Sequence, residues 1–299
     1  MRSPHAPPAD RAAGGPAIPE PLAGAPAVGP PVPGGDALRT IVVAGIVVLV
    51  ALPLIPLVLH SFAGRWLYPA LVPESWGLRA WQYIGRPRSQ VLEATGTSLG
   101  IAAAVTALSL LVGVPAGRGL ASARPGTRAA LEYLFFAPVI IPALSVALGL
   151  HVVFIRWGIA DSVAGVVVAH LLPTVPYMVL VMASTFSSTN LELEHQARTL
   201  GASAVRAFTS VGVPSAVPGI LTGSLFVFLI SWSQYALTVL IGGGRVVTLP
   251  LLLFSFASAG DLALTAALSI VFLAPAVLIL AITARYLSGR SLALAGVAG

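Results

Sequence analysis

Few side chains in this sequence could carry chemistry within its apolar stretches. His151 and His170 lie inside such stretches, and an ionisable group there is a candidate for function. The alternative is a neutral histidine that is hydrogen-bonded to a neighbouring helix. Glu132, Asp161 and Asp261 all fall at predicted helix ends, so the sequence predicts no buried carboxylate relay of the kind that a proton-coupled carrier uses.

The composition excludes several catalytic chemistries. The chain contains no Cys and no Lys, which excludes thiolate catalysis, disulfides, Cys metal sites and a standard P-loop for ATP. The serines follow no recognised nucleophile motif, and His, Asp and Glu have no metal-ligand spacing. We therefore predict a chain with no enzymatic activity, no cofactor and no metal, whose energy comes from another subunit.

The densest polar and aromatic cluster within an apolar stretch contains Ser231, Trp232, Gln234 and Tyr235. Trp and Tyr offer flat faces to a cation or a sugar, and Ser and Gln offer hydrogen bonds. The cluster is therefore a candidate for lining a solute pathway. The alternative is polar contact between helices combined with interfacial aromatic residues.

The composition is that of a polytopic membrane protein. Of 299 residues, 57% are hydrophobic and 9% are charged, with a mean hydropathy of +0.94. A membrane-spanning helix needs about 20 apolar residues, and six segments qualify. The arginines are scattered, so no nucleic-acid partner is predicted. The expected fold is all-α, with spans at 39–62, 95–117, 130–154, 163–185, 215–241 and 264–287.

These segments divide the chain. Residues 1–38 are rich in Pro, Ala and Gly, as in a disordered cytoplasmic tail. The span at 39–62 is expected to kink at its prolines, and residues 63–94 form an extracytoplasmic loop whose Trp residues suit an interfacial belt or a short surface helix. Residues 95–287 form the main transmembrane region, and 288–299 a cytoplasmic tail. Three Gly pairs at small-xxx-small spacing predict at least one close helix contact: Gly96–Gly100, Gly113–Gly117 and Gly219–Gly223.

A polar, amphipathic island at 190–214 separates two apolar segments. Asn190 can cap a short helix over 191–200, and Gly201 can end it in a left-handed conformation. Ser203 can cap a second short helix that ends near Pro214. The order of Glu194 and Arg198 favours a helical ion pair.

Leu193, Ala197 and Leu200 form an apolar stripe on the first helix of this island. Such a helix–Gly–helix segment fits a groove on a soluble partner. The alternative is an ordinary cytoplasmic helical hairpin.

The island resembles the "EAA" coupling loop of type I ABC importer permeases, whose pattern is Glu-Ala-Ala, three residues, Gly, nine residues, then Ile-x-Leu-Pro. Here nine residues separate Gly201 from the segment Val-Gly-Val-Pro that ends at Pro214. In the first half only Ala197 matches. His195 takes the Glu position, and Glu194 stands one residue earlier. The resemblance covers about residues 95–285.

The resemblance implies which residues and partners matter. Residues that would couple to an ATPase are Glu194, His195, Ala197, Arg198, Gly201, Ala202 and Pro214. The implied partners are a cytoplasmic ABC ATPase dimer, a second identical or homologous permease, an extracytoplasmic solute-binding protein and membrane lipid. The implied location is a bacterial inner membrane, with both termini cytoplasmic.

Two groups of motifs point to different solutes. Residues 169–173 with Pro176-Tyr177, and 200–203, are most similar to polyamine and aminoethylphosphonate permeases. Residues 231–235, Thr248-Leu249-Pro250 and the short tail after Tyr286 are more similar to sugar permeases. A polyamine or aminoethylphosphonate-like solute is favoured, with a sugar as the alternative. A secondary transporter is the alternative of another class, although no inverted repeat is found.

Overall fold

The structure is a computed structural model that describes residues 35–66, 69–87, 89–188 and 192–295. Most of the predicted N-terminal tail, the predicted cap Asn190 and the last four residues of the predicted C-terminal tail lie outside the described residues. The described residues divide into two units between Leu52 and Pro53. In the first unit, helix α1 covers Gly35–Ala51, so it begins before the predicted start at residue 39.

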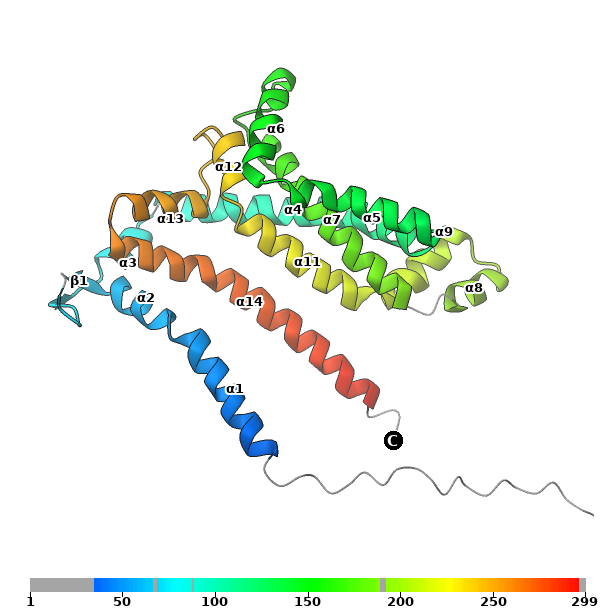
Figure 1. Cartoon of the computed structure of the whole chain (residues 1–299), viewed down its shortest axis with the longest axis horizontal. Helices are drawn as coiled ribbons and strands as arrows, with labels where there is room; N and C mark the ends of the chain where they lie inside the picture. The colour runs from blue at the N-terminus through cyan, green and yellow to red at the C-terminus, as the bar shows by residue number, and fades with distance from the viewer. Residues whose placement is uncertain (1–34, 67–68, 88, 189–191, 296–299) are drawn as a thin grey trace, which may run out of the picture. The chain divides into compact units, whose positions relative to one another are not determined.

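The larger unit is built on three adjacent apolar helices, α4 (Gln90–Ala121), α7 (Val163–Ser188) and α11 (Val217–Trp232), which pack along one another (Figure 1). Helix α14 (Leu262–Ala295) packs against α11 and against the short α2 (Leu54–Ser61). Helices α4 and α7 both begin with a serine cap. The backbone N–H of Leu92 donates to Ser89 over 3.2 Å, and that of Gly165 donates to Ser162 over 3.0 Å.

The most extensive helix contact lies between α4 and α7, and glycine makes it possible. A Cβ atom at Gly113 would lie 2.3 Å from Cγ of Met178. One at Gly117 would lie 2.5 Å from Cβ of Met182. In lipid there is little hydrophobic drive between helices, so small residues that let backbones approach supply much of the packing. Buried Val105, Met178 and Met182 continue this contact into the core.

A second glycine pair makes a similar contact between α11 and α7. A Cβ atom at Gly219 would lie 2.0 Å from Oγ1 of Thr185, and one at Gly223 would lie 2.7 Å from Sδ of Met178. Gly96 and Gly100 have no such neighbours within 4 Å. The prediction that at least one of the three glycine pairs lies at a helix contact is therefore confirmed.

The third predicted span, 130–154, is not one helix. It is divided into α5 (Pro125–Ile140) and α6 (Ala143–Trp157). A proline disfavours helical geometry at the residue before it, and Ile141, which precedes Pro142, is extended with ψ of 136°. Because α5 begins at Pro125, Glu132 lies inside this helix and not at a helix end. Its carboxylate forms an ion pair with Arg128 at 2.8 Å.

The fifth predicted span, 215–241, is also divided. The short α10 (Val213–Ser215) leads into α11, and the axes of 204–215 and 217–232 differ by 71°. Helix α11 then ends at Trp232, and α12 (Ala236–Ile241) follows after a break of three residues. The hydroxyl of Ser233 donates to the carbonyl of Leu229 over 2.8 Å at this break.

The segment before α4 folds into small elements that the sequence did not predict in detail. Strands β1 (Ala63–Arg65) and β2 (Ser75–Trp76) pair antiparallel, and α3 (Arg79–Ile84) follows them. Trp81 lies in α3, as the short surface helix alternative requires. Helix α13 (Leu249–Ser258) packs against α4 and α14 at the same end of the unit (Figure 1).

Within the described residues, four helices are long and apolar enough to cross a membrane, or five if the bent pair 204–215 and 217–232 counts as one span. The four are Leu38–Ser61, Gln90–Ala121, Val163–Ser188 and Leu262–Arg285. The helical fold class is confirmed, whereas the count of six is not. The last helix also continues to Ala295, beyond the predicted end of the span at residue 287.

We expect Gly117→Ala to destabilise the protein. The new methyl group would lie 2.5 Å from Cβ of Met182 and 2.8 Å from the carbonyl oxygen of Val179, and such overpacking costs about 1–3 kcal/mol. The matched control is Gly100→Ala on the same helix, which has open space. Thermal melting in detergent should show a lower midpoint for the first variant only, and equal midpoints would contradict the contact.

Candidate functional site

The predicted coupling segment forms as a helix, a glycine turn and a second helix. Helix α8 covers Glu192–Thr199, and Gly201 has φ of +93°. The N–H of Gly201 donates to the carbonyl of Arg198, and that of Ala202 to the carbonyl of Ala197, both over 3.0 Å. These two bonds are the Schellman arrangement that ends a helix at a left-handed residue, so the predicted left-handed helix end at Gly201 is confirmed.

The second half of the segment begins at α9 (Ala204–Ala207). Its predicted cap is confirmed, because the N–H of Arg206 donates to the hydroxyl of Ser203 over 3.3 Å. A π-helical turn, η1 (Phe208–Gly212), joins α9 to α10. Pro214 is exposed in α10, just before the chain bends into α11.

The outer face of this segment is apolar and exposed. Leu193 is 49% exposed, Leu200 88% and Val205 73%. His195 and Arg198 are exposed beside them, and Ala197 and Ala202 are half-buried. Exposed apolar side chains on so short a segment are the feature that an interaction surface would have. Figure 1 shows α8 and α9 together at one end of the long helices.

Glu194 has a different place from the one predicted. It is only 4% exposed, and its carboxylate accepts an ion pair from Nη2 of Arg118, in the last turn of α4, and not from Arg198. The helical spacing of Glu194 and Arg198 predicted the wrong partner because α8 turns its glutamate inward. The guanidinium of Arg118 also lies 4.4 Å from the ring centroid of Phe208.

The predicted solute-pathway cluster separates into two pairs. Ser231 and Trp232 are buried at the end of α11, whereas Gln234 and Tyr235 are half-buried in the break before α12. Trp232 stacks between Phe228 and Phe272, and its indole N–H donates to the carbonyl of Phe272 over 3.0 Å. This geometry matches the alternative of helix–helix contact for Trp232.

His170 makes hydrogen bonds to neighbouring helices, as the alternative to a functional histidine predicted. Its Nδ1 lies 2.9 Å from the hydroxyl of Ser231 on α11, and its Nε2 lies 3.0 Å from that of Thr238 on α12. Thr174, which donates to the carbonyl of His170, lies 3.1 Å from Ser109 on α4. The network joins four helices and leaves both ring nitrogens partnered.

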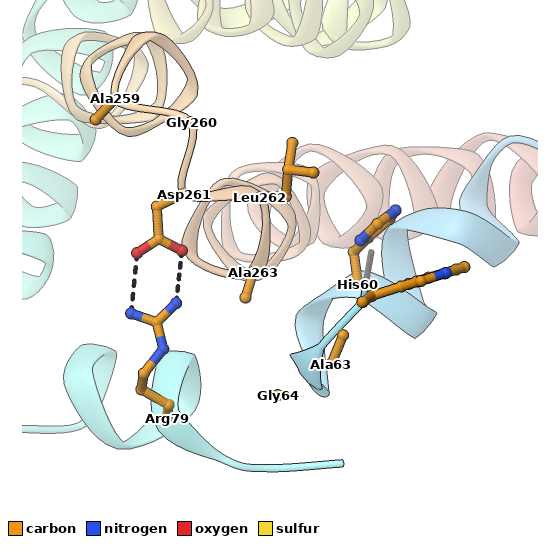
Figure 2. A pocket seen from close by; sticks show the side chains of 10 residues that line it. His60, Ala63, Gly64, Arg79, Ala259, Gly260, Asp261, Leu262 and Ala263 are labelled. Atoms are coloured by element: carbon orange, nitrogen blue, oxygen red, sulfur yellow. Dashed lines mark hydrogen bonds and ion pairs between the residues drawn. The ribbon is translucent and has the colours of Figure 1, made fainter. Parts of the chain in front are cut away.

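The sequence analysis did not predict two cavities that lie among the described residues. One of about 400 Å³ lies between α2, β1 and the turn before α14, and Figure 2 shows Arg79 forming two parallel hydrogen bonds with Asp261 across it. Their lengths are 2.9 and 2.7 Å, and they lower the pKa of Asp261 from its usual 3.8. No local spacing connects residues 182 positions apart, so the sequence carried no signal for the pair.

The second cavity, also about 400 Å³, is a groove between the C-terminal end of α7 and the N-terminal end of α11. We call it the hydroxyl groove, because its polar side chains are all hydroxyls. Serines one helical turn apart on α7 were the available signal. The groove is lined by Val181, Ser184, Thr185, Ser188, Pro218, Gly219 and Thr222. In the described part of the chain, no group of three His, Asp or Glu side chains could hold a metal ion.

The chain belongs to the family described as "Binding-protein-dependent transport system inner membrane component", whose model matches residues 96–291. It is therefore a polytopic inner-membrane protein. The matched region includes the glycine contact, the hydroxyl groove and the coupling segment.

Among curated proteins, a molybdate/tungstate transport system permease protein of Pyrococcus abyssi is 36% identical over 45% of this chain and 54% of its own length. The chain thus spans about half the length of that relative. A putrescine transport system permease protein of Escherichia coli is 27% identical over 68% of this chain and 74% of its own. A bacterial ABC transporter for alginate import, with a TM-score of 0.66 and 16% identity over 84% of this chain and 95% of that one, shares the fold.

We expect Trp232→Ala to act on stability first. Truncation of a buried aromatic side chain costs about 3–5 kcal/mol because it leaves a cavity, here between Phe228 and Phe272. Trp232→Phe keeps the stacking but loses the indole hydrogen bond and part of the buried volume, so its midpoint should fall less than that of Trp232→Ala. Melting midpoints in detergent check this order. An unchanged midpoint for Trp232→Ala would contradict this structural role. Trp232 would then again be a candidate for lining the solute pathway.

Proposed function

We propose that this chain is the membrane-spanning subunit of an ATP-driven importer and performs no chemistry itself. The observation that carries this proposal is the coupling segment, which exposes Leu193, Leu200 and Val205 around a left-handed Gly201. An apolar lever of this form fits a groove on a soluble ATPase. Two cytoplasmic ATPase subunits would dock on the coupling segments of two paired permease subunits, and ATP binding would move each segment as a rigid body.

The remaining partners follow from the same scheme. A second permease, identical or homologous, would complete the pathway, and a binding protein would deliver solute at the opposite end of the long helices. Both chain termini would lie in the cytoplasm with the coupling segment. The family description, which refers to binding-protein-dependent transport, supports this arrangement.

The proposed solute is a small tetrahedral oxyanion of the molybdate class. Relatives named for molybdate or tungstate have higher identity to this chain, 36% against 27% for a putrescine permease. The hydroxyl groove contains neither a carboxylate nor a basic side chain among its lining residues, so its charge favours neither a dianion nor a polyamine. The hydroxyls of Thr185, Ser188 and Thr222 donate to backbone carbonyls of their own helices. The identity of the relatives is therefore the observation that supports an oxyanion.

A polyamine, favoured by the sequence motifs alone, is the second candidate. The specific observation in its favour is coverage, because the match to the putrescine permease extends over 68% of this chain against 45% for the molybdate relative. The likeness to the alginate importer at 16% identity shows the fold alone, so it carries no argument for a sugar.

An uptake experiment separates the candidates. Cells that carry the complete importer should take up radiolabelled molybdate in an ATP-dependent manner, and deletion of this chain should abolish the uptake. Excess tungstate should compete because its shape and charge are the same, whereas putrescine should not. Uptake of radiolabelled putrescine in place of molybdate would establish the second candidate. Absence of ATP-dependent uptake of either would contradict the importer proposal for these two solute classes.

We expect Gly201→Val to uncouple the importer without preventing insertion. A β-branched residue in the left-handed region costs about 1–2 kcal/mol, which is enough to reshape the turn between α8 and α9. Membrane levels should be normal, and co-purification of the ATPase should fall. The matched control is Gly201→Asn, because asparagine tolerates this conformation and the site is open within 4 Å of a Cβ atom. Normal co-purification with Gly201→Val would contradict the coupling role.

A further inference from the structure

The coupling segment has an inner face that packs against the rest of the unit and points away from the proposed ATPase. Glu194 occupies this face and is 4% exposed, although an ionised carboxylate is costly to bury unless it is paired. Its partner Arg118 belongs to α4, 76 residues earlier. The pair therefore connects the segment that would meet the ATPase to the helix that forms the centre of the transmembrane unit.

The surroundings of the pair hold both side chains in place. The guanidinium of Arg118 lies over the ring of Phe208 at 4.4 Å, and Phe208 packs against Phe186 of α7 with 6.1 Å between ring centroids. The carboxylate of Glu194 reaches so near the backbone of Gly212 that a Cβ atom there would lie 2.3 Å from Oε1. The carboxylate of Glu194 is thus enclosed between η1 and the end of α4, whereas the side chain of Arg118 remains 33% exposed.

The end of α4 that carries Arg118 is itself firmly placed. The preceding residue, Gly117, makes the close backbone contact with α7, with 2.8 Å between its hypothetical Cβ and the carbonyl oxygen of Val179. A displacement of α8 that pulls on Glu194 must therefore move α4 and α7 together. The exposed side chains Leu193 and Leu200 remain available on the other side of α8.

We propose that the Arg118–Glu194 ion pair transmits the movement of the coupling segment to α4, so that both are positioning residues for transport. The proposal rests on the proposed function, because it requires an ATPase that acts on α8. Loss of the pair leaves the outer face of α8 intact, so the ATPase still binds and hydrolyses ATP. What is lost is the coordinated movement of the helices that line the pathway.

The test is a double-mutant cycle in proteoliposomes that contain the complete importer. The variants are Arg118→Gln, Glu194→Gln and the combination of both. The quantities measured are phosphate release and uptake of radiolabelled molybdate, or of putrescine where the wild-type importer transports that instead. Each single variant should lower the uptake per ATP about tenfold, within the range of one coupling interaction. The double variant should lower it by the same factor, because the two residues act as one pair.

A matched control pair exists on the same side of the unit. Arg128 and Glu132 form an exposed ion pair on α5, with both side chains 36% exposed, and Arg128 also donates to the hydroxyl of Ser187 on α7 over 3.2 Å. The same glutamine variants there should leave the uptake per ATP unchanged, since exposed pairs contribute little. Co-purification of the ATPase should equal wild type in all six variants.

The outcomes separate this proposal from the importer proposal. A wild-type complex that transports normally, with single variants of Arg118 and Glu194 that keep a normal uptake per ATP, overturns the positioning role alone. A double variant that loses the product of the two single effects, about a hundredfold, also overturns it, because independent residues multiply. A wild-type complex that neither binds an ATPase nor transports would overturn the importer proposal instead.

Discussion

The structure depends on the close approach of α4 and α7 through Gly113 and Gly117. In a bilayer the apolar side chains gain little from meeting each other, so the fit between backbones decides which helices associate. At these two positions any side chain would overlap Met178 or Met182. The contact also places the last turn of α4, because Arg118 follows Gly117 directly. The packing of two membrane helices therefore sets the position of a charge at the coupling segment.

Hydrogen bonds between buried polar side chains stabilise the break between two helices of the unit. His170 contacts Ser231 before the break between α11 and α12, and Thr238 after it. Each such hydrogen bond between membrane helices is worth about 0.6 kcal/mol on average. Two bonds from one ring nevertheless fix the angle at which the chain leaves α11. The break itself is tolerable because irregular backbone within a membrane protein is stable where it is buried in protein.

Turns and helix caps that depend on neighbouring residues were predictable from the sequence, whereas contacts between distant residues were not. The left-handed turn at Gly201 and the cap at Ser203 depend on residues within five positions, so composition and spacing sufficed for them. The partner of Glu194 lies 76 residues away, and the helical spacing rule pointed to Arg198 because it takes no account of which face of α8 is buried. The interruption at Ile141 and Pro142 was missed for another reason. Hydropathy averaged over twenty residues stays high across a proline that ends one helix and begins the next.

The coupling segment combines two features that would each be unfavourable in a free helix. A carboxylate is buried, and large apolar side chains are exposed to solvent. The Arg118 ion pair offsets the first, and nothing within the described part of the chain covers Leu200 or Val205. A helix that served only to connect two spans would gain free energy from rotating its leucines inward and its glutamate outward. In the observed orientation the carboxylate is paired with Arg118 and the apolar side chains face outward, where a partner can cover them. The ion pair thus offsets the burial of Glu194 and links the inner face of α8 to α4.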